Sequence, residues 1–523
     1  MKLSILKQQL IERNKSLHEN DRISSIRSEY KSNLTKDNES VEIDKSYDPN
    51  MNIEIKNATY YNQNETLSEL DINTNLLNDE QYLPSYNVGI NNENTNKLDS
   101  IKIIGITGSR GKSTTAYIVH EYIKSLGYKS ILYSSIKVDS PASYIDPNEP
   151  CEISLQNENV LLDIIEEAQA YDSDYIVMEI NESTISKGLT NGIPFKVRAL
   201  TNIIPKHNEE QYTPEEYVKI KKSFFENIPN DEDCTCVFGL TSFTRDEFNH
   251  LLRLNNHPKL TYSTKYVCEV RNADYTNIDC LLHEMNSSLN GLDMKIRVKD
   301  QTYDFKTSVI LPFNAHNFNC AITILEALNI FDAQKFNMSI ATLEIPGRDE
   351  MIKTNSRTII IGLSIMPALE IFKNNKTGMK INKIKVVTGA VGTGFINWNK
   401  EFHTEEYLSK ISGFRQYAMN YVRDNADYAY LTSCDNAAED PYMIAQEMQR
   451  YINNEISTTI VVDREEAIKK AIIESEQGDI IYIAGRGNRR IFCDSLNTIK
   501  LIQDKDVVYK VLQDLGWQIN GKQ

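Results

Sequence analysis

The stretch IKIIGITGSRGKST, residues 101–114, decides the fold class of this chain. Residues 101–106 form a nearly continuous apolar run of the length expected for a strand buried on both faces. A glycine-containing turn follows, and residues 114–126 show the apolar periodicity of a helix. This order of strand, turn and helix predicts an α/β domain whose turn binds the phosphates of a mononucleotide.

The chemistry of the turn supports a phosphate site. Glycines let the backbone turn tightly and direct amides at phosphate oxygens, and the helix N-terminus adds positive potential. Lys112 is expected to reach the β- and γ-phosphates and Ser113 to coordinate Mg²⁺. The spacing is a variant, because the standard pattern requires glycine at position 106, which is Ile. The expected ATP-binding residues of the turn are Gly108, Ser109, Arg110, Gly111, Lys112, Ser113 and Thr114.

The second half of the chain also alternates strand-like and helical patterns. Strand-like runs occupy residues 358–361, 384–388, 428–432, 459–462 and 480–484, with helical patterns between them. This alternation predicts a doubly wound, Rossmann-like sheet in a domain of its own.

Residues 1–99 differ from the rest, since they are rich in Asn, Asp, Glu, Ser and Lys. Within this region, only residues 1–17 have the pattern of an amphipathic helix. We interpret it as a surface helix that leads into loosely ordered chain, with a docking element as the alternative. The predicted division is a divergent N-terminal region (1–99), a central ATP-binding domain (100–345) and a C-terminal domain (346–523).

Composition restricts the class of protein. The chain has 523 residues, of which 40% are hydrophobic and 25% charged, as in soluble proteins with two to four domains. Its formal net charge of -16 disfavours binding to nucleic acid or anionic lipid. Eight scattered cysteines without a CxxC pair, and no apolar run of membrane-spanning length, favour reduced thiols and a cytoplasmic location.

The variant loop resembles the ATP loop of the Mur ligase family, the ATP-dependent enzymes that add amino acids to the peptidoglycan precursor. Met178-Glu179 resembles the strand end whose Glu holds Mg²⁺ in that family. Residues 201–207 are similar to its TN-x-x-x-D-H segment, with Lys206 in place of Asp and His207 retained. Taken alone, Glu179 also fits a solvent-facing strand end, and His207 a loop histidine.

Further segments match in the same order. Residues 217–225 are similar to the YxxAKxxLF segment, which places Lys221 at the lysine that becomes carbamylated and serves as a metal ligand. Without the resemblance, Lys221 would read as part of a solvated helix face. Asn317 corresponds to the Asn that contacts adenine, and Arg348, within Pro346–Glu350, to a phosphate-contacting Arg that alone would read as an ion-paired surface residue.

Within the family, residues 463–468 and 484–487 are similar to the DRxxAI and AGKG segments of the UDP-N-acetylmuramoyl-tripeptide synthetase branch. Two departures stand out. Residues 1–99 lack the DSR segment and glycine-rich pattern that accompany UDP-sugar binding, and residues 361–364 replace the DYAH segment. The resemblance leaves recognition of the UDP-N-acetylmuramoyl group open.

The residues expected to bind the incoming amino acid also differ from those of the family. Residues 434–441 lack the Arg of the DNPR segment that diaminopimelate enzymes carry, and Arg489 replaces an acidic residue of the AGKGHE segment. These changes reverse the local charge preference and disfavour diaminopimelate. The residues expected near the amino acid are Asp435, Asn436, Gly485 and Arg489.

The resemblance implies an ATP-dependent acid–amino acid ligase that works through an acyl phosphate. Its cofactors would be ATP and Mg²⁺, with two metal ions and a carbamylated Lys221. The implied catalytic residues are Lys112, Glu179, His207, Lys221 and Arg348, and the implied metal ligands are Ser113, Glu179, His207 and Lys221. The expected partners are small molecules: a carboxylate acceptor, such as UDP-N-acetylmuramoyl-dipeptide, and an amino acid. Two alternatives stay open: a ligase of the same fold with a non-peptidoglycan acceptor, and a non-catalytic ATP-binding homologue.

Overall fold

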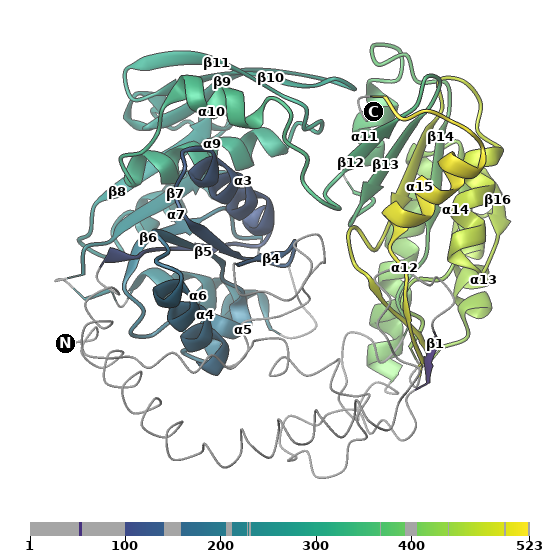
Figure 1. Cartoon of the computed structure of the whole chain (residues 1–523), viewed down its shortest axis with the longest axis horizontal. Coiled ribbons are helices and arrows are strands. Elements are labelled where there is room, and N and C mark those ends of the chain that lie inside the picture. The colour runs from purple at the N-terminus through teal and green to yellow at the C-terminus, as the bar shows by residue number, and fades with distance from the viewer. Residues whose placement is uncertain are drawn as a thin grey trace, which may run out of the picture.

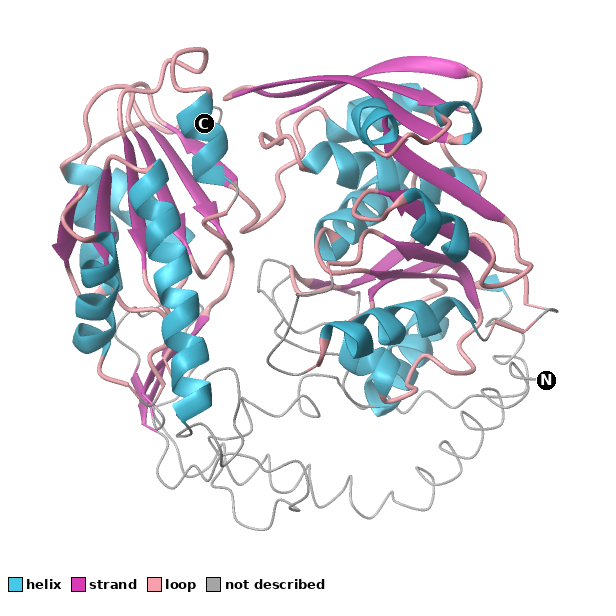
Figure 2. Cartoon of the chain, turned by 180° about the vertical axis from the view of Figure 1, so that it is seen from behind, coloured by secondary structure: helices cyan, strands magenta, loops and turns pink. Residues whose placement is uncertain are grey.

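The computed structural model describes residues 52–54, 100–140, 158–204, 212–226, 228–229, 232–366, 368–392, 405–437, 439–495 and 498–520. Within them lie two α/β units side by side, one built on a ten-stranded sheet and the other on a six-stranded sheet (Figures 1 and 2). The α/β fold class predicted from the sequence is confirmed. The helix expected in residues 1–17 lies outside the described residues, and the proposed domain boundaries remain predictions.

The central unit is a mixed sheet with the phosphate-loop strand in its interior. In spatial order its strands are β11 (Gln301–Thr307), β10 (Gly291–Val298), β9 (Cys280–Ser288), β8 (Lys259–Thr264), β7 (Thr235–Leu240), β6 (Phe195–Leu200), β2 (Lys102–Thr107), β5 (Tyr175–Glu179), β3 (Ser130–Tyr133) and β4 (Val138–Asp139). Neighbours from β9 to β3 run parallel, whereas β11, β10 and β4 are antiparallel. The parallel strands are buried on both faces, which explains their continuous apolar runs.

Helices cover both faces of this sheet. One face packs against α3 (Lys112–Ser125), α9 (Asn314–Ala327) and α10 (Ala333–Ile340). The other packs against α4 (Glu158–Ala170), α5 (Glu182–Ser186), α6 (Pro214–Glu226), α7 (Arg245–Leu251) and α8 (Lys265–Val270). A short 3-10 helix, η4 (Tyr275–Asn277), precedes β9. Because the carboxyl ends of β3, β5, β2 and β6 are neighbours at one edge, residues that follow them meet there.

The C-terminal unit has the strand order β12 (Glu350–Lys353), β13 (Thr358–Gly362), β17 (Ile480–Ala484), β14 (Ile384–Thr388), β15 (Tyr428–Leu431) and β16 (Ser457–Ile460). All neighbours are parallel except the antiparallel pair β12 and β13. Helices α11 (Ala368–Asn374), α12 (Glu405–Asn425) and α13 (Pro441–Ile452) lie on one face, and α14 (Arg464–Ile473) and α15 (Asp504–Asp514) on the other. A small sheet joins β1 (Asn52–Glu54), β19 (Thr498–Leu501) and β18 (Ile491–Ser495).

A buried ion pair ties the loops of this second unit together. Arg464 donates from Nε to Asp504 Oδ1 and from Nη2 to Asp504 Oδ2, each at 2.7 Å. The same guanidinium donates to the backbone carbonyls of Ser433, at 3.2 Å, and Ala484, at 3.0 Å. Both side chains are almost wholly buried, so the pair positions the loops that follow β15 and β17.

Replacing Asp504 by Ala should therefore lower the free energy of unfolding by about 3–5 kcal/mol, because Arg464 is left buried without a counter-charge. Urea denaturation followed by circular dichroism measures the change. The exposed Asp514, on the same helix α15, is the matched control, and its replacement by Ala should change stability by at most about 0.5 kcal/mol. Equal stability of both variants would contradict the assigned role of the pair.

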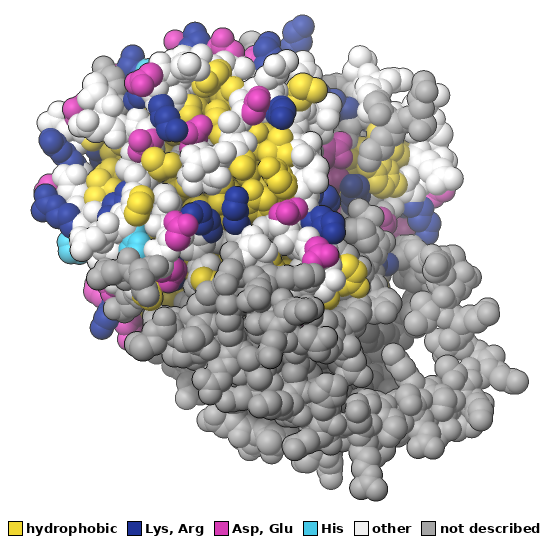
Figure 3. Space-filling model, turned by 60° about the vertical axis from the view of Figure 1, so that its left-hand side comes forward, with side chains coloured by type: hydrophobic (Ala, Val, Ile, Leu, Met, Phe, Trp, Pro, Cys, Tyr) yellow, Lys and Arg dark blue, Asp and Glu magenta, His cyan; other side chains and the backbone are white. Residues whose placement is uncertain are grey.

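The described surface of the central unit mixes both signs of charge. Figure 3 shows Lys and Arg side chains interspersed with Asp and Glu, and hydrophobic side chains between them. On the face seen in Figure 3, an anionic ligand would therefore meet local cations rather than a broad positive surface. Among the described residues, no helix is both long enough and apolar enough to cross a membrane.

Candidate active site

The phosphate loop lies between β2 and α3 and depends on two glycines. Gly108 has a φ of +143° and Gly111 a φ of +83°, both in the region that favours glycine. A Cβ on Gly108 would stand 2.0 Å from Thr201 Oγ1, and one on Gly111 would stand 2.2 Å from Asn317 Oδ1. Side chains at these two positions would clash with the end of β6 and with α9, and would displace the loop.

Thr201 and Asn202, directly after β6, hold this loop in place. The amides of Ser109 and Arg110 donate to the backbone carbonyl and the side-chain Oδ1 of Asn202, each at 3.0 Å. In return, Asn202 Nδ2 and Thr201 Oγ1 donate to the Arg110 carbonyl, at 2.9 and 2.7 Å. The sequence marked this segment only by resemblance, and the structure shows that it fixes the loop backbone.

The Ser109 hydroxyl forms hydrogen bonds within the protein, behind the phosphate loop. Its Oγ accepts from Tyr217 OH at 2.9 Å and from the Ile204 amide at 2.8 Å, and the side chain is buried. The structure does not test the expected contact between Ser109 and ATP, which stays a prediction.

Helix α3 begins directly behind the loop. Among the described residues no side chain caps it, and its N-cap is Gly111. The amides of the first turn thus face the loop without a protein acceptor, as at helix ends that bind phosphate. Asn317, near the start of α9, is buried beside Gly111 and donates to Asn314 Oδ1 at 3.0 Å.

Lys112 and Glu179 face each other across the loop. Lys112 Nζ donates to the Gly108 carbonyl at 3.0 Å and lies 3.9 Å from Glu179 Oε1. The other carboxylate oxygen, Oε2, accepts from Ser134 Oγ at 3.2 Å and from the amide and hydroxyl of Ser135 at 3.0 and 3.1 Å. Burial alone would raise the pKa of Glu179, but the charge of Lys112, hydrogen bonds from the Ser135 amide and the Ser113 hydroxyl, and the charge of Arg348 outweigh it and lower that pKa. Glu179 is therefore an anion at neutral pH.

Ser113 and Arg348 meet at one hydroxyl. Ser113 Oγ lies 3.0 Å from Ser135 Oγ, and Arg348 Nη2, from the C-terminal unit, donates to the same oxygen at 3.4 Å. A second contact lies beside it, where Asn488 Nδ2 donates to the Ile136 carbonyl at 2.6 Å. The two units therefore touch where the predicted metal ligands Ser113 and Glu179 come together.

Lys221 is wholly buried on α6 and paired with a residue that the sequence analysis missed. Its Nζ lies 2.9 Å from Glu182 Oε2 and donates to Thr107 Oγ1 at 3.2 Å. Burial and the charge of Lys112 lower the pKa of Lys221 to about 8, although Glu182 opposes them. Burial would raise the pKa of Glu182, but Lys221 and Lys112 lower it to about 2. Glu182 begins the helix just after Glu179, and that proximity was the only available sequence signal.

His207, a predicted catalytic residue and metal ligand, lies outside the described residues. The structure brings together Lys112, Ser113, Glu179 and Arg348, with Lys221 behind them through Thr107. The role of His207 stays a prediction.

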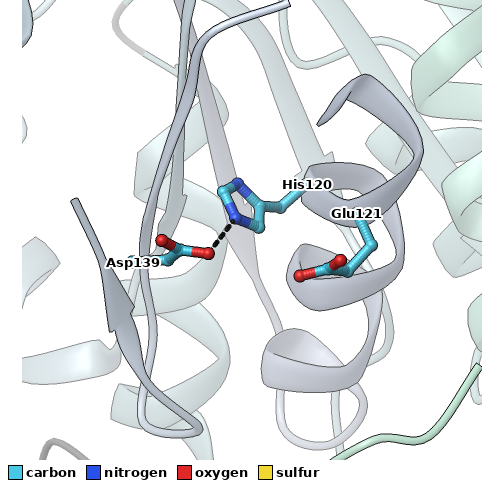
Figure 4. Close-up of side chains that lie close together, drawn as sticks. All are labelled: His120, Glu121 and Asp139. Carbon is cyan, nitrogen blue, oxygen red and sulfur yellow. Dashed lines mark hydrogen bonds and ion pairs between the residues drawn. The ribbon is translucent and has the colours of Figure 1, made fainter. Parts of the chain in front are cut away.

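A second cluster of potential metal ligands consists of His120 and Glu121, on α3, and Asp139, on β4 (Figure 4). His120 Nε2 lies 3.0 Å from Asp139 Oδ2, which also accepts from Lys124 at 2.8 Å and from Lys137 at 2.9 Å. Lys137 is also 3.4 Å from Glu121 Oε1. Two lysines thus already neutralise the two carboxylates, and the cluster acts as a clamp between β4 and α3 rather than a metal site.

The expected amino-acid residues gather at the carboxyl ends of β15 and β17. Asp435, fully buried with a φ of +51°, accepts from Arg486 Nη1 at 2.7 Å. Arg489 Nη1 lies 3.9 Å from Asp435 Oδ2, and the Arg489 side chain is one-third exposed. Gly485 has a φ of +106°, and a Cβ there would stand 3.3 Å from Cys434 Sγ. Asn436 donates to the Asp494 carbonyl at 3.3 Å. Because Asn436 follows Asp435 and Gly485 precedes Arg486, the contacts of Asp435 with Arg486 and Arg489 bring the four residues together.

The residues of the central site fit a nucleotide with a divalent cation. Ser113 and Glu179 offer the hard oxygen ligands that Mg²⁺ prefers, and an uncapped helix start faces them. Glu179 Oε1 lies 3.9 Å from the Lys112 ammonium, beyond hydrogen-bond distance, so a cation that displaces this ammonium can bind the oxygen. The arrangement can hold phosphates from one unit while Arg348 approaches from the other.

The fold and this site together define a phosphate-loop enzyme with a Rossmann-like second unit. The model of the Mur ligase middle domain matches residues 106–325, and that of the Mur ligase glutamate ligase domain matches residues 400–487. The chain belongs to the Mur ligase family of ATP-dependent, amide-bond-forming ligases. The resemblance inferred from the motifs is confirmed.

Relatives and solved structures agree with this assignment. The chain is 27% identical over 441 residues to UDP-N-acetylmuramyl-tripeptide synthetase of Ligilactobacillus salivarius (strain UCC118). The alignment covers 79% of this chain and 79% of the relative. It is 24% identical over 394 residues to UDP-N-acetylmuramoyl-L-alanyl-D-glutamate--2,6-diaminopimelate ligase of Geobacillus kaustophilus (strain HTA426), in an alignment that covers 74% of this chain and 74% of the relative. A solved structure of a ligase with the latter name shares the fold, with a TM-score of 0.54 at 20% identity, over 80% of this chain and 79% of that one.

Proposed function

We propose that the chain joins a carboxylate acceptor to an amino acid, with ATP converting the acid into an acyl phosphate that the amine then attacks. The observation that carries this proposal is the convergence of Lys112, Glu179 and Arg348 at one uncapped helix start. The named relatives act on UDP-N-acetylmuramoyl peptides, which makes such a peptide the first acceptor to test. A cytoplasmic location follows from this assignment.

In the proposed reaction, the residues of the site neutralise different parts of the phosphate charge. Lys112 moves from the Gly108 carbonyl to the transferring phosphate, and Arg348 approaches the same phosphate from the C-terminal unit. Ser113 and Glu179 would hold Mg²⁺, which neutralises phosphate charge when bound. Because Arg348 belongs to the other unit, the site is complete only when the two units are closed.

We further propose that Lys221 is carbamylated and acts with His207 at a second metal ion. The support is chemical: a buried amine with a pKa of about 8 is neutral far more often than an exposed lysine, and only the neutral amine reacts with CO₂. The carbamate would be an anion beside Glu182, which itself favours a cation between them.

The charge of the C-terminal site supports an amino acid without a second ammonium group. Asp435 is already paired with Arg486, and Arg489 lies partly exposed at the same place. A distal ammonium, as in diaminopimelate or lysine, would meet a surplus of positive charge there. We propose that Arg489 favours a neutral or acidic side chain.

The test is phosphate release by the purified full chain with ATP, Mg²⁺ and UDP-N-acetylmuramoyl-dipeptide, screened against basic, neutral and acidic amino acids, with Lys112→Ala as the blank. We expect release to require both the acceptor and a neutral or acidic amino acid. Release with diaminopimelate alone would contradict the charge argument.

A second candidate is a ligase of the same fold whose acceptor lies outside peptidoglycan synthesis, favoured by the absence of a UDP-sugar pattern in residues 1–99. ATP binding without release in any arm of the screen would favour this acceptor change or a non-catalytic homologue. Binding of UDP alone, measured by calorimetry, separates the alternatives, because only the peptidoglycan acceptor requires it.

A further inference from the structure

The hairpin between β3 and β4 brings two adjacent serines to the centre of the site. β3 and β4 pair antiparallel through Leu132 with Asp139 and Tyr133 with Val138, and the Ser134 amide donates to the Lys137 carbonyl at 3.2 Å. The clamp formed by His120 and Asp139 fixes the base of this hairpin to α3. Its tip, residues 134–137, is therefore held at a set distance from the start of the same helix.

The Ser135 hydroxyl has several partners at this tip. Its Oγ donates to Glu179 Oε2 at 3.1 Å and lies 3.0 Å from Ser113 Oγ, and the Ser113 hydroxyl also hydrogen-bonds Glu179. Arg348 Nη2 donates to the same Ser135 oxygen at 3.4 Å. One hydroxyl thus contacts both oxygen ligands proposed for the cation and the arginine of the other unit.

We propose that Ser135 is a positioning residue that orients Glu179 and Ser113 toward the divalent cation. The inference rests on the proposed function, since it assumes that these two residues hold that cation. With Oε2 occupied by donors from the hairpin, Glu179 is left to present Oε1, the oxygen that faces Lys112. Without the Ser135 hydroxyl, Oε2 keeps its contacts with the Ser134 hydroxyl and the Ser135 amide, but the contact that links Glu179 to Ser113 and Arg348 is lost.

Ser134 provides a matched comparison on the same hairpin. It donates to Glu179 Oε2 at 3.2 Å and accepts from the Ile136 amide at 3.2 Å. No contact with Ser113 or Arg348 is recorded for it within the described residues. Loss of its hydroxyl removes one of the three donors to Oε2 and leaves the junction at Ser135 intact.

The experiment measures Mn²⁺ binding by electron paramagnetic resonance, on the full chain with the non-hydrolysable analogue AMP-PNP, for wild type, Ser135→Ala, Ser135→Thr and Ser134→Ala. We expect Ser135→Ala to weaken Mn²⁺ binding about tenfold, because a charge-assisted hydrogen bond is lost. Ser135→Thr, which keeps a hydroxyl at an exposed position, should stay within about threefold of wild type. Ser134→Ala should fall between them.

Wild-type Mn²⁺ affinity in Ser135→Ala would overturn the inference, as would a Ser135→Thr variant as weak as Ser135→Ala. An equal or larger loss in Ser134→Ala would also overturn it, since the shared cause would then be a disturbed hairpin. Thermal melting of each variant identifies any unfolded sample. If the wild type itself binds no Mn²⁺ with AMP-PNP, the proposed function fails, and that result differs from a failure confined to Ser135.

Discussion

Replacing Lys112 by Ala should lower the rate of ATP-dependent phosphate release by about 10³-fold. The ammonium lies 3.9 Å from Glu179 and donates to the loop carbonyl of Gly108. In the proposed reaction it would leave this carbonyl and bind the transferring phosphate. Its charge is needed most when negative charge develops on the transferring group. The loss should therefore appear mainly in kcat, with a smaller change in the KM for ATP.

The measurement is a steady-state phosphate assay of the full chain with the substrates that the screen identifies. Lys335→Ala is the matched control, because Lys335 is an exposed lysine on α10, away from the loop. The control should retain wild-type kinetics. A Lys112→Ala variant with more than about a tenth of the wild-type kcat would contradict the role of this lysine.

The second large effect is expected at Lys221. Replacing it by Ala should lower kcat by about 10²-fold if a carbamate on its Nζ completes the metal site. Lys219→Ala is the matched control, since Lys219 lies on the same helix but is exposed. Because Lys221→Ala also leaves Glu182 without its ion-pair partner, thermal melting must accompany the assay.

The carbamate itself can be detected without an activity assay. With a pKa of about 8, the Lys221 amine is neutral in about a tenth of molecules at pH 7 and about nine tenths at pH 9, in the absence of modification. At fixed dissolved CO₂, the carbamate signal in ¹³C NMR should therefore rise with pH across this window. It should be absent in Lys221→Ala and unchanged in Lys219→Ala. A wild-type sample without the signal at pH 9 would contradict the proposed modification.

The sequence predicted the parts of this molecule that depend on local patterns. The run before the phosphate loop became β2, and the runs at 384–388 and 480–484 became β14 and β17 with the same bounds. Strands buried on both faces are continuously apolar, so they are visible without neighbours. Strands β9, β10 and β11, which pair antiparallel with one another, were missed, because their exposed faces interrupt the apolar runs with polar residues.

The candidate site was predictable where a motif carries the chemistry and not where contacts create it. Lys112 begins α3 and Glu179 ends β5, each in a recognisable motif, and the structure places them together. The role of Glu182 depends on its ion pair with Lys221, on a different helix. The role of Ser135 depends on contacts that include Arg348, from the other unit. Likewise, the pairing of Asp435 with Arg486 depends on β14 lying between β15 and β17, which sequence order does not reveal.

The contacts between the two units have a consequence for the solution conditions under which the enzyme can work. In the described part of the chain, the hydrogen bonds that cross between them end on neutral acceptors: the Ser135 hydroxyl, the Ile136 carbonyl and the Asn290 side chain, which Lys353 reaches at 2.9 Å. None of these contacts pairs opposite formal charges, so dissolved ions screen them far less than they screen ion pairs. The charge of Arg348 also attracts Glu179 across the two units. High ionic strength should therefore weaken that attraction and the binding of anionic substrates, while it leaves these three hydrogen bonds largely intact.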